Sequence, residues 1–202
     1  MDRLIEGYRR FRAGTWPERR ALFERLAEQG QRPRAMVVGC VDSRADPAMI
    51  FDAAPGELLV VRNVANLVPP YAPDGAHHST SAALEFGVRA LEVRDLIVLG
   101  HAMCGGIRAL LGGPAAGPTD FVADWIAIAA PARERALVCA PAGDAQIACE
   151  HEAVKLSLRN LMTFPWIAER VRDGRLKLHG ARFDIRSGVL ELLKPDGSFA
   201  PA

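Results

Sequence analysis

Two short polar stretches, each directly after an apolar run, most constrain how this chain can fold. The run at 35–38 leads into Gly39-Cys40-Val41-Asp42-Ser43-Arg44, and the run at 95–99 leads into Gly100-His101-Ala102-Met103-Cys104-Gly105-Gly106. Runs this short and continuously apolar are typical of parallel strands buried on both faces. Because the carboxyl ends of parallel strands meet at one edge of a sheet, we expect the two polar stretches to lie side by side.

The composition is that of an ordinary globular protein. Half of the 202 residues are hydrophobic, which suffices for one well-buried domain over 1–202. The net charge of +1 balances 25 basic against 24 acidic residues with no run of like charge, so we expect neither nucleic acid nor a membrane as partner. The charged N-terminus is unlike a signal peptide, and no apolar stretch could cross a bilayer. We therefore expect a cytoplasmic protein, in which the four cysteines are thiols or metal ligands.

The order of elements predicts an α/β fold with a mainly parallel central sheet flanked by helices. A helical N-terminal arm at 1–30 precedes an α/β core at 31–202, and an antiparallel hairpin forms the C-terminal edge. A Gly-, Ala- and Pro-rich break from Gly112 is the candidate linker. The predicted strands are 35–38, 58–61, 95–99, 176–179, 183–185 and 189–192, and the predicted helices after the arm are 47–51, 79–91, 107–111, 120–128, 144–162 and 165–174.

Helix starts are predicted from capping chemistry. Thr15 and Glu18 have the spacing of a capping box, with a proline in the first turn. Asp46 before a proline is expected to cap the next helix, and Ser79 or Ser81 the one after it. The two arm helices are amphipathic, and periodicity alone does not decide whether they cover the sheet or reach a partner subunit.

Cys40, His101 and Cys104 form a ligand set suited to Zn²⁺. Three protein ligands leave a fourth position for water, as in catalytic zinc sites. His101 and Cys104 are close in sequence, whereas Cys40 must come from another strand. The alternative is that both cysteines are buried as small apolar side chains and that His101 is a hydrogen-bonded loop residue.

Asp42 and Arg44 flank this candidate metal site. A carboxylate and a guanidinium two residues apart can form a bidentate pair that directs the carboxylate toward the site. The alternative is an ion pair that only caps a helix. The Gly105-Gly106 turn would leave backbone N–H groups free at a helix start, where an anionic substrate could bind.

The motif Cys40-Val41-Asp42-Ser43-Arg44, followed by His101-Ala102-Met103-Cys104-Gly105, resembles the signature of the β-class carbonic anhydrases. Similar blocks follow one another in the family's order over nearly the whole chain. These blocks are 50–52, 55–58, 61–66, 81–86, 157–161 and 178–180.

This resemblance implies a zinc-dependent enzyme that reversibly hydrates CO₂ to bicarbonate and a proton by zinc-bound hydroxide. It implies one Zn²⁺ per subunit held by Cys40, His101 and Cys104, with Asp42 and Arg44 as the orienting dyad. It also implies a homodimer, or a higher even oligomer, with active sites beside the subunit interface.

Two other functions fit the same residues. The site could hydrolyse CS₂ or COS, or the chain could be a non-catalytic zinc-binding or bicarbonate-sensing homologue with Asp42 on the metal. Family members with that closed arrangement share an extra bicarbonate pocket made of Trp, Arg and Tyr. Only Arg62 matches here, because Val37 and Phe183 stand at the other two positions, so we expect Asp42 to stay off the metal.

Further residues are candidates for supporting roles. Asn66 and Arg62 could line the cleft, or Arg62 could form an interface ion pair. His77 and His78 could relay protons to buffer, although solvated loop histidines are the simpler interpretation. The remaining histidines and cysteines, His151, His179, Cys139 and Cys149, are expected to be structural or inert.

Overall fold

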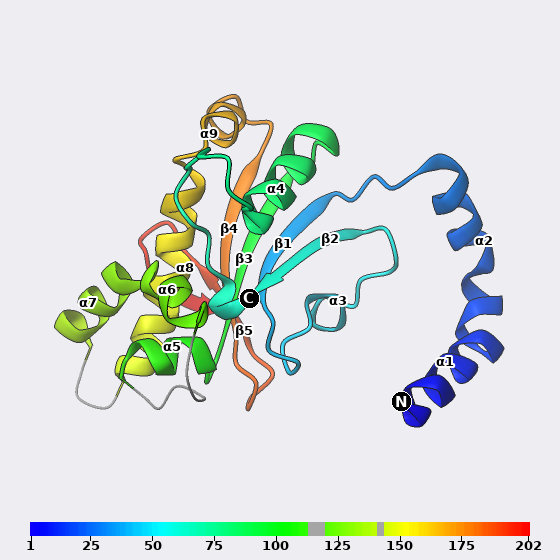
Figure 1. Cartoon of the computed structure of the whole chain (residues 1–202), viewed down its shortest axis with the longest axis horizontal. Helices are drawn as coiled ribbons and strands as arrows, with labels where there is room; N and C mark the ends of the chain where they lie inside the picture. The colour runs from blue at the N-terminus through cyan, green and yellow to red at the C-terminus, as the bar shows by residue number, and fades with distance from the viewer. Residues whose placement is uncertain (113–119, 141–143) are drawn as a thin grey trace.

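A six-stranded sheet lies at the centre of the molecule (Figure 1), in a computed structural model that describes residues 1–112, 120–140 and 144–202. The strand order is β2-β1-β3-β4-β5-β6, parallel from β2 to β4 and antiparallel beyond β4. This confirms the predicted α/β fold with its antiparallel C-terminal edge. The strands are β1 (Ala35–Cys40), β2 (Leu58–Asn63), β3 (Asp95–His101), β4 (Lys177–Phe183), β5 (Leu190–Leu193) and β6 (Phe199–Pro201).

The helices of the described residues include two arm helices and seven in the body. The candidate linker after Gly112 lies outside the described residues. In chain order the helices are α1 (Asp2–Ala13), α2 (Thr15–Gln29), α3 (Pro47–Ile50), η1 (Val64–Asn66), α4 (Ser79–Glu85) continuing as the π-helical turn η2 (Phe86–Ala90), α5 (Gly105–Leu110), α6 (Val122–Ala127), α7 (Ala130–Cys139), α8 (Ala145–Leu161) and α9 (Pro165–Arg172).

Strands β1, β2 and β3 each extend two residues beyond their predicted carboxyl ends, and β4 extends four. Parallel pairing continues through Gly39 opposite Arg62, and through Gly100 opposite Arg182. Gly100 does not mark a turn: a Cβ there would lie 2.8 Å from Val154 on α8, so the glycine lets this helix pack closely on the sheet. As a result, Cys40 and His101 are the last residues of their strands.

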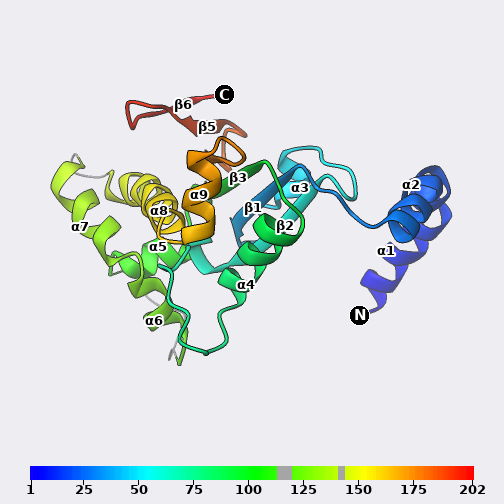
Figure 2. The same cartoon turned by 90° about the horizontal axis from the view of Figure 1, so that it is seen from above.

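Helices cover the two faces of the sheet unequally. Helices α4, α8 and α9 lie on one face (Figure 2), and their side chains form the largest core with Met36, Val38 and Leu96. The opposite face carries a smaller cluster around Val37 and Leu99, against which the short helix α3 packs. Beside that cluster lies a cavity of about 620 Å³, so part of the sheet has no helix of its own chain over it.

Two of the three predicted caps are wrong. Asp46 does cap α3, because its carboxylate accepts the N–H groups of Ala48 and Met49 at 2.9 and 3.1 Å. Thr15, however, is the first residue of α2, which follows α1 after Gly14 alone and has no side-chain cap. Helix α4 begins at Ser79 after His78, again without a side-chain cap, so both candidate serines lie inside the helix.

Helix α7, strand β6 and the short helix η1 were not predicted from the sequence. Helix α7 buries only alanines, such as Ala132 and Ala136, so it lacks the stripe of large apolar residues that marks an amphipathic helix. Strand β6 is three residues long and pairs with β5 after a turn at Gly197, whose φ of 84° suits glycine.

The N-terminal arm, α1 and α2, stands away from the sheet (Figures 1 and 2). Neither helix contains a buried residue. Phe11, Trp16 and Phe23 pack on one another, with Trp16 and Phe23 stacked at 5.1 Å, and hold the two helices together. Periodicity left two options for the arm, covering its own sheet or reaching a partner subunit. The first of these is wrong, because the arm does not cover the sheet.

Among the described residues, no helix has the length and apolar character needed to span a membrane.

Candidate functional site

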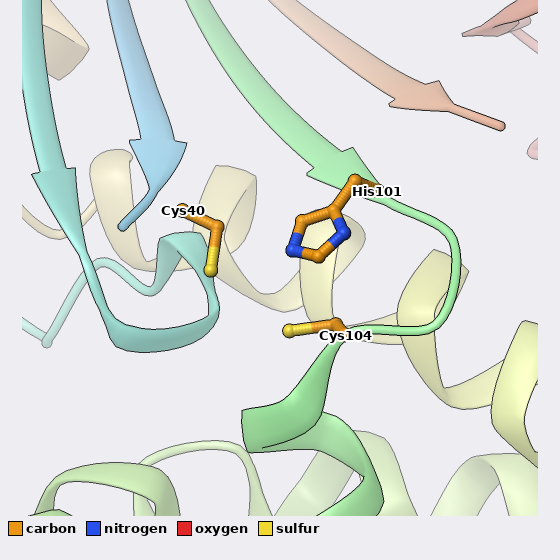
Figure 3. Close-up of side chains that lie close together, drawn as sticks. All are labelled: Cys40, His101 and Cys104. Atoms are coloured by element: carbon orange, nitrogen blue, oxygen red, sulfur yellow. The ribbon is translucent and has the colours of Figure 1, made fainter. Parts of the chain in front are cut away.

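Three side chains from separate parts of the chain converge at the carboxyl edge of the sheet (Figure 3). Cys40 ends β1, His101 ends the neighbouring strand β3, and Cys104 directly precedes α5. Their candidate ligand atoms all lie within 4.8 Å of one another, and all three residues are buried. The two strand-end stretches therefore meet as the sequence predicted, and they form a group that could hold a metal ion.

The imidazole of His101 is oriented for metal binding. Its Nδ1 donates to the carbonyl oxygen of Ala102 at 2.9 Å, which leaves Nε2 facing the two thiols. Nε2 is buried and has no hydrogen-bond partner among the described residues. A buried polar atom without a partner is costly, so this geometry fits a ligand atom whose metal would satisfy it.

The two thiols are electrostatically coupled. The pKa of Cys40 is lowered to about 4, mainly because the Cys104 thiol donates to it and in smaller part because of His101, against the opposing effect of burial. The pKa of Cys104 is raised, because its proton is held by Cys40 and because burial disfavours a second thiolate. One thiolate thus forms readily, and a bound cation would favour the second.

Asp42 and Arg44 form the expected bidentate pair. Arg44 donates from Nε to Oδ1 of Asp42 at 2.9 Å and from Nη2 to Oδ2 at 2.7 Å, and its backbone N–H donates to Oδ1. The guanidinium beside it keeps the pKa of Asp42 well below its usual range. Oδ2 also lies 3.8 Å from Nε2 of His101. The carboxylate is therefore ionised and directed at the edge of the Cys-His-Cys group.

Arg62 holds the loop from Cys40 to Asp46 in place through hydrogen bonds. It donates to the carbonyl oxygens of Cys40 and Asp42 at 2.8 and 2.7 Å, and to the carboxylate of Asp46 at 3.0 Å. Its ion pair is thus made within the chain, and its guanidinium is occupied by backbone groups. Val37 is fully buried.

The predicted substrate-side residues lie around the start of α5. A Cβ on Gly105 would meet nothing within 4 Å, whereas one on Gly106 would lie 3.0 Å from the Cβ of Ala65. Ala65 and Asn66 adopt left-handed backbone conformations, and the Asn66 carbonyl accepts from Ser157 Oγ at 3.3 Å. Gly106 is therefore required for packing, while the backbone at Gly105 is open.

Among the hydrogen bonds of the described residues, none joins His77 or His78 to the Cys-His-Cys group. His78 pairs with Asp74 at 2.7 Å, and it lines a groove of about 290 Å³ with Tyr71 and Phe164. His77 is exposed. A proton relay through these histidines stays a prediction.

The other histidines and cysteines occupy positions that suit structural roles. His179 pairs with Asp95 at 2.8 Å, and His151 lies 3.3 Å from Glu191. Cys139 is exposed, whereas burial raises the pKa of Cys149 to about 11.

The sequence did not predict the residues of α8 and β4 that support the backbone of Cys104. Glu150 accepts the Cys104 N–H at 3.1 Å, and Gln146 donates to the Cys104 carbonyl at 3.2 Å. Arg182 pairs with Glu150 at 2.9 Å. The one available signal was the spacing of Gln146 and Glu150, four residues apart on α8, whose other buried residues are apolar except Ser157.

The comparison with known proteins identifies the family. The family model for carbonic anhydrases matches residues 35–190. The chain belongs to the β-carbonic anhydrase family. Beta carbonic anhydrase 3 of Arabidopsis thaliana is 36% identical over 208 residues, covering 100% of this chain and 80% of that relative. Reversible CO₂ hydration is the function of this family, which places the chain among the carbonate dehydratases, a class of lyases.

Solved β-carbonic anhydrases share the fold over the whole chain. The structure of CcaA superposes with a TM-score of 0.93 at 34% identity, covering 100% of this chain and 92% of CcaA. A tetrameric β-carbonic anhydrase of Sordaria macrospora superposes with a TM-score of 0.82 at 26% identity, covering 98% of each chain.

Proposed function

We propose that this β-carbonic anhydrase binds one Zn²⁺ per subunit through Cys40, His101 and Cys104, and that Asp42 and Arg44 orient the attacking water. The observation that carries the proposal is the buried, partnerless Nε2 of His101, which faces two coupled thiols beside an ionised carboxylate. Two sulfur donors and one imidazole nitrogen suit zinc, and three protein ligands leave a position open for catalysis.

Zinc bound here supplies a Lewis acid that makes water nucleophilic near neutral pH. Asp42 would accept a hydrogen bond from this water and would direct the oxygen lone pair at the carbon of CO₂. Arg44 holds both carboxylate oxygens, so Asp42 does not rotate away from this task. Gly105, Gly106 and Asn66 are the proposed substrate side of the pocket. Attack on CO₂ would form one C–O bond while the electron pair of one C=O π bond moves onto its oxygen, giving bicarbonate. The released proton would pass to solvent or buffer, for which His77 and His78 are candidate carriers.

The bond between Asp42 and Arg44 supports the catalytic arrangement over a sensing one. For Asp42 to join the metal, its carboxylate would have to give up two guanidinium bonds of 2.9 and 2.7 Å. The non-catalytic alternative needs that rearrangement, whereas the hydrating enzyme needs none.

We also propose a homodimer, or a higher even oligomer built from it. The arm exposes Leu4 and Tyr8 at 73% and 58%, and the open face of the sheet has apolar side chains around its 620 Å³ cavity. Apolar surfaces of this kind mark interaction sites. The arm of one copy would pack on the open sheet face of a second copy, and the reverse contact would follow by symmetry. Exposed Val41 and Met103 adjoin the metal group, which supports an interface beside the active site.

Four free cysteines support the cytoplasm as the compartment.

Zinc content and stopped-flow CO₂ hydration between about pH 6.5 and 9 test the proposal. We expect about one zinc per chain, lost in Cys40→Ser and retained in the matched control Cys139→Ser, whose thiol is exposed. Asp42→Asn should retain zinc but lower kcat/KM by about 10- to 100-fold, the usual cost of losing a group that orients a metal's ligands.

Two outcomes would contradict the proposed reaction. Zinc-loaded protein without CO₂ hydration at pH 8.5 would exclude it. Faster turnover of COS or CS₂ than of CO₂ in parallel assays would assign the same site to those substrates.

A further inference from the structure

A buried carboxylate lies directly behind the Cys-His-Cys group. Glu150 projects from α8, and its side chain is only 1% exposed. Its sequence neighbour Cys149 and the nearby Ala153 and Val154 are buried and apolar. A charge in such surroundings is strongly unfavourable unless it is paired and hydrogen-bonded, so packing alone does not explain a glutamate here.

Glu150 and Gln146 contact both backbone polar groups of Cys104, whose carbonyl oxygen also accepts the N–H of Arg108 at 3.0 Å. The Cys104 N–H donates to Oε1 of Glu150 at 3.1 Å. Gln146 Nε2 donates to the Cys104 carbonyl at 3.2 Å and to the same Glu150 oxygen at 2.7 Å. Because the two side chains are four residues apart, they project from one face of α8 and grip Cys104 as a unit.

Arg182 on β4 fixes the other oxygen of Glu150. Its Nε donates to Oε2 of Glu150 at 2.9 Å, and its Nη1 donates to Glu191 at 2.8 Å. The Arg182 side chain is 4% exposed. Its positive charge balances Glu150, whose negative charge would otherwise disfavour an ionised sulfur on the adjacent Cys104. Each oxygen of Glu150 therefore has its own partners.

The turn that carries Cys104 is also held at Met103, whose carbonyl oxygen accepts from Arg44 Nη2 at 3.3 Å. Met103 adopts a left-handed conformation with φ of 58° and is 41% exposed. On the other side, Gly105 would contact nothing within 4 Å even with a Cβ. Among the hydrogen bonds of the described residues, the Cys104 N–H is bonded to Glu150 alone, so the orientation of this end of Cys104 depends on α8.

We infer that Glu150 is a positioning residue for Cys104: together with Gln146 and Arg182, it fixes the backbone of the third ligand so that its sulfur stays directed at the metal. This inference rests on the proposed zinc site. Groups that orient a ligand in this way typically change metal affinity or activity by 10- to 100-fold when they are lost.

Zinc release measures this role without relying on catalysis. Transfer of zinc from the loaded full-length protein to a chromogenic chelator should be about 10- to 100-fold faster for Glu150→Ala. Glu150→Gln should show a smaller acceleration, because its amide oxygen still accepts the Cys104 N–H while Arg182 loses its anion. Glu152→Gln is the matched control: Glu152 is on the same helix but pairs with Lys155 at 2.7 Å, and we expect the wild-type rate.

The visible spectrum of the Co²⁺-substituted protein separates positioning from general stability. A changed geometry at Cys104 should shift the cobalt ligand-field and sulfur charge-transfer bands in both Glu150 variants and leave them unchanged in Glu152→Gln. If Glu150→Ala fails to fold, Glu150→Gln decides. Glu150 variants that lose only thermal stability, with wild-type zinc release and cobalt spectra, would overturn the inference while leaving the proposed function intact. A wild-type protein that binds no metal would overturn both.

Discussion

Arg62 shows how a single side chain can set the shape of the loop from Cys40 to Asp46. Its guanidinium reaches two backbone carbonyls and one carboxylate at 2.7 to 3.0 Å, a set that the rigid planar fork of arginine matches and a lysine ammonium does not. We expect Arg62→Lys to lower the free energy of unfolding by about 1–3 kcal/mol, because partly buried acceptors lose their donors. Urea denaturation of the zinc-free protein measures this directly.

Arg175→Lys is the matched control for that measurement. Arg175 pairs with Asp173 and Glu169 at the surface, where its side chain is 48% exposed. Exposed pairs contribute little, so its replacement should change stability by less than about 0.5 kcal/mol. Equal effects of the two substitutions would show that Arg62 makes no special contribution to the loop.

At the scale of residues, the sequence revealed the chemistry at the strand ends but not the support behind it. Cys40, His101 and Cys104 were predictable because each follows an apolar run at the edge where parallel strands end. Glu150 and Arg182 were not, because a charged residue on a helix or strand is usually solvated. Only the packing of α8 against β3 and β4 shows that these two charges are buried together.

At the scale of elements, periodicity located most helices and strands, whereas their ends depended on tertiary contacts. Asp46 was a reliable cap because a proline follows it and the chain turns there from an extended conformation. Ser79 was not, because α4 starts one residue earlier than a serine cap requires. Helix α7 was not predicted, because its only buried residues are alanines, which pack against α8.

The contact between α8 and the C-terminal hairpin β5–β6 should weaken in acid. His151 of α8 stacks on Phe199 of β6 at 4.0 Å and lies 3.3 Å from Glu191 of β5. Burial lowers the pKa of His151 below its ordinary value of 6.5; Arg182 adds to this effect, while Glu191 and Glu150 oppose it. The folded state therefore prefers the neutral imidazole. Its contribution is complete above the unfolded pKa and is lost as the pH falls below about 6.5.

Urea unfolding at pH 7.5, 6.5 and 5.5 checks this sign. The wild type should lose more stability over this range than His151→Gln, which cannot be protonated. The control His77→Gln changes an exposed histidine and should follow the wild type. Identical pH dependence of the wild type and His151→Gln would exclude His151 as the responsible group.

At the scale of the whole molecule, the sequence predicted the α/β class but not where the arm lies. Amphipathic periodicity says only that one face of each helix seeks apolar contact, and that contact can come from its own sheet or from another subunit. The structure leaves α1 and α2 without a buried residue and leaves a cavity of about 620 Å³ on the open face of the sheet. Within one chain, both surfaces stay exposed.

If the arm packs against a second copy of the chain, charged residues introduced on its apolar face should dissociate the dimer. Leu4 and Tyr8 are four residues apart on α1, so both lie on one side of the helix. Burying two such side chains contributes about 3–6 kcal/mol, so Leu4→Glu with Tyr8→Glu should weaken association by about 100-fold or more. Sedimentation velocity should then show the 21.9 kDa subunit, whereas Glu6→Gln on the same helix should sediment as the wild type. A wild type that is monomeric at micromolar concentration, or a doubly substituted protein that stays dimeric, would show that the arm does not hold the subunits together.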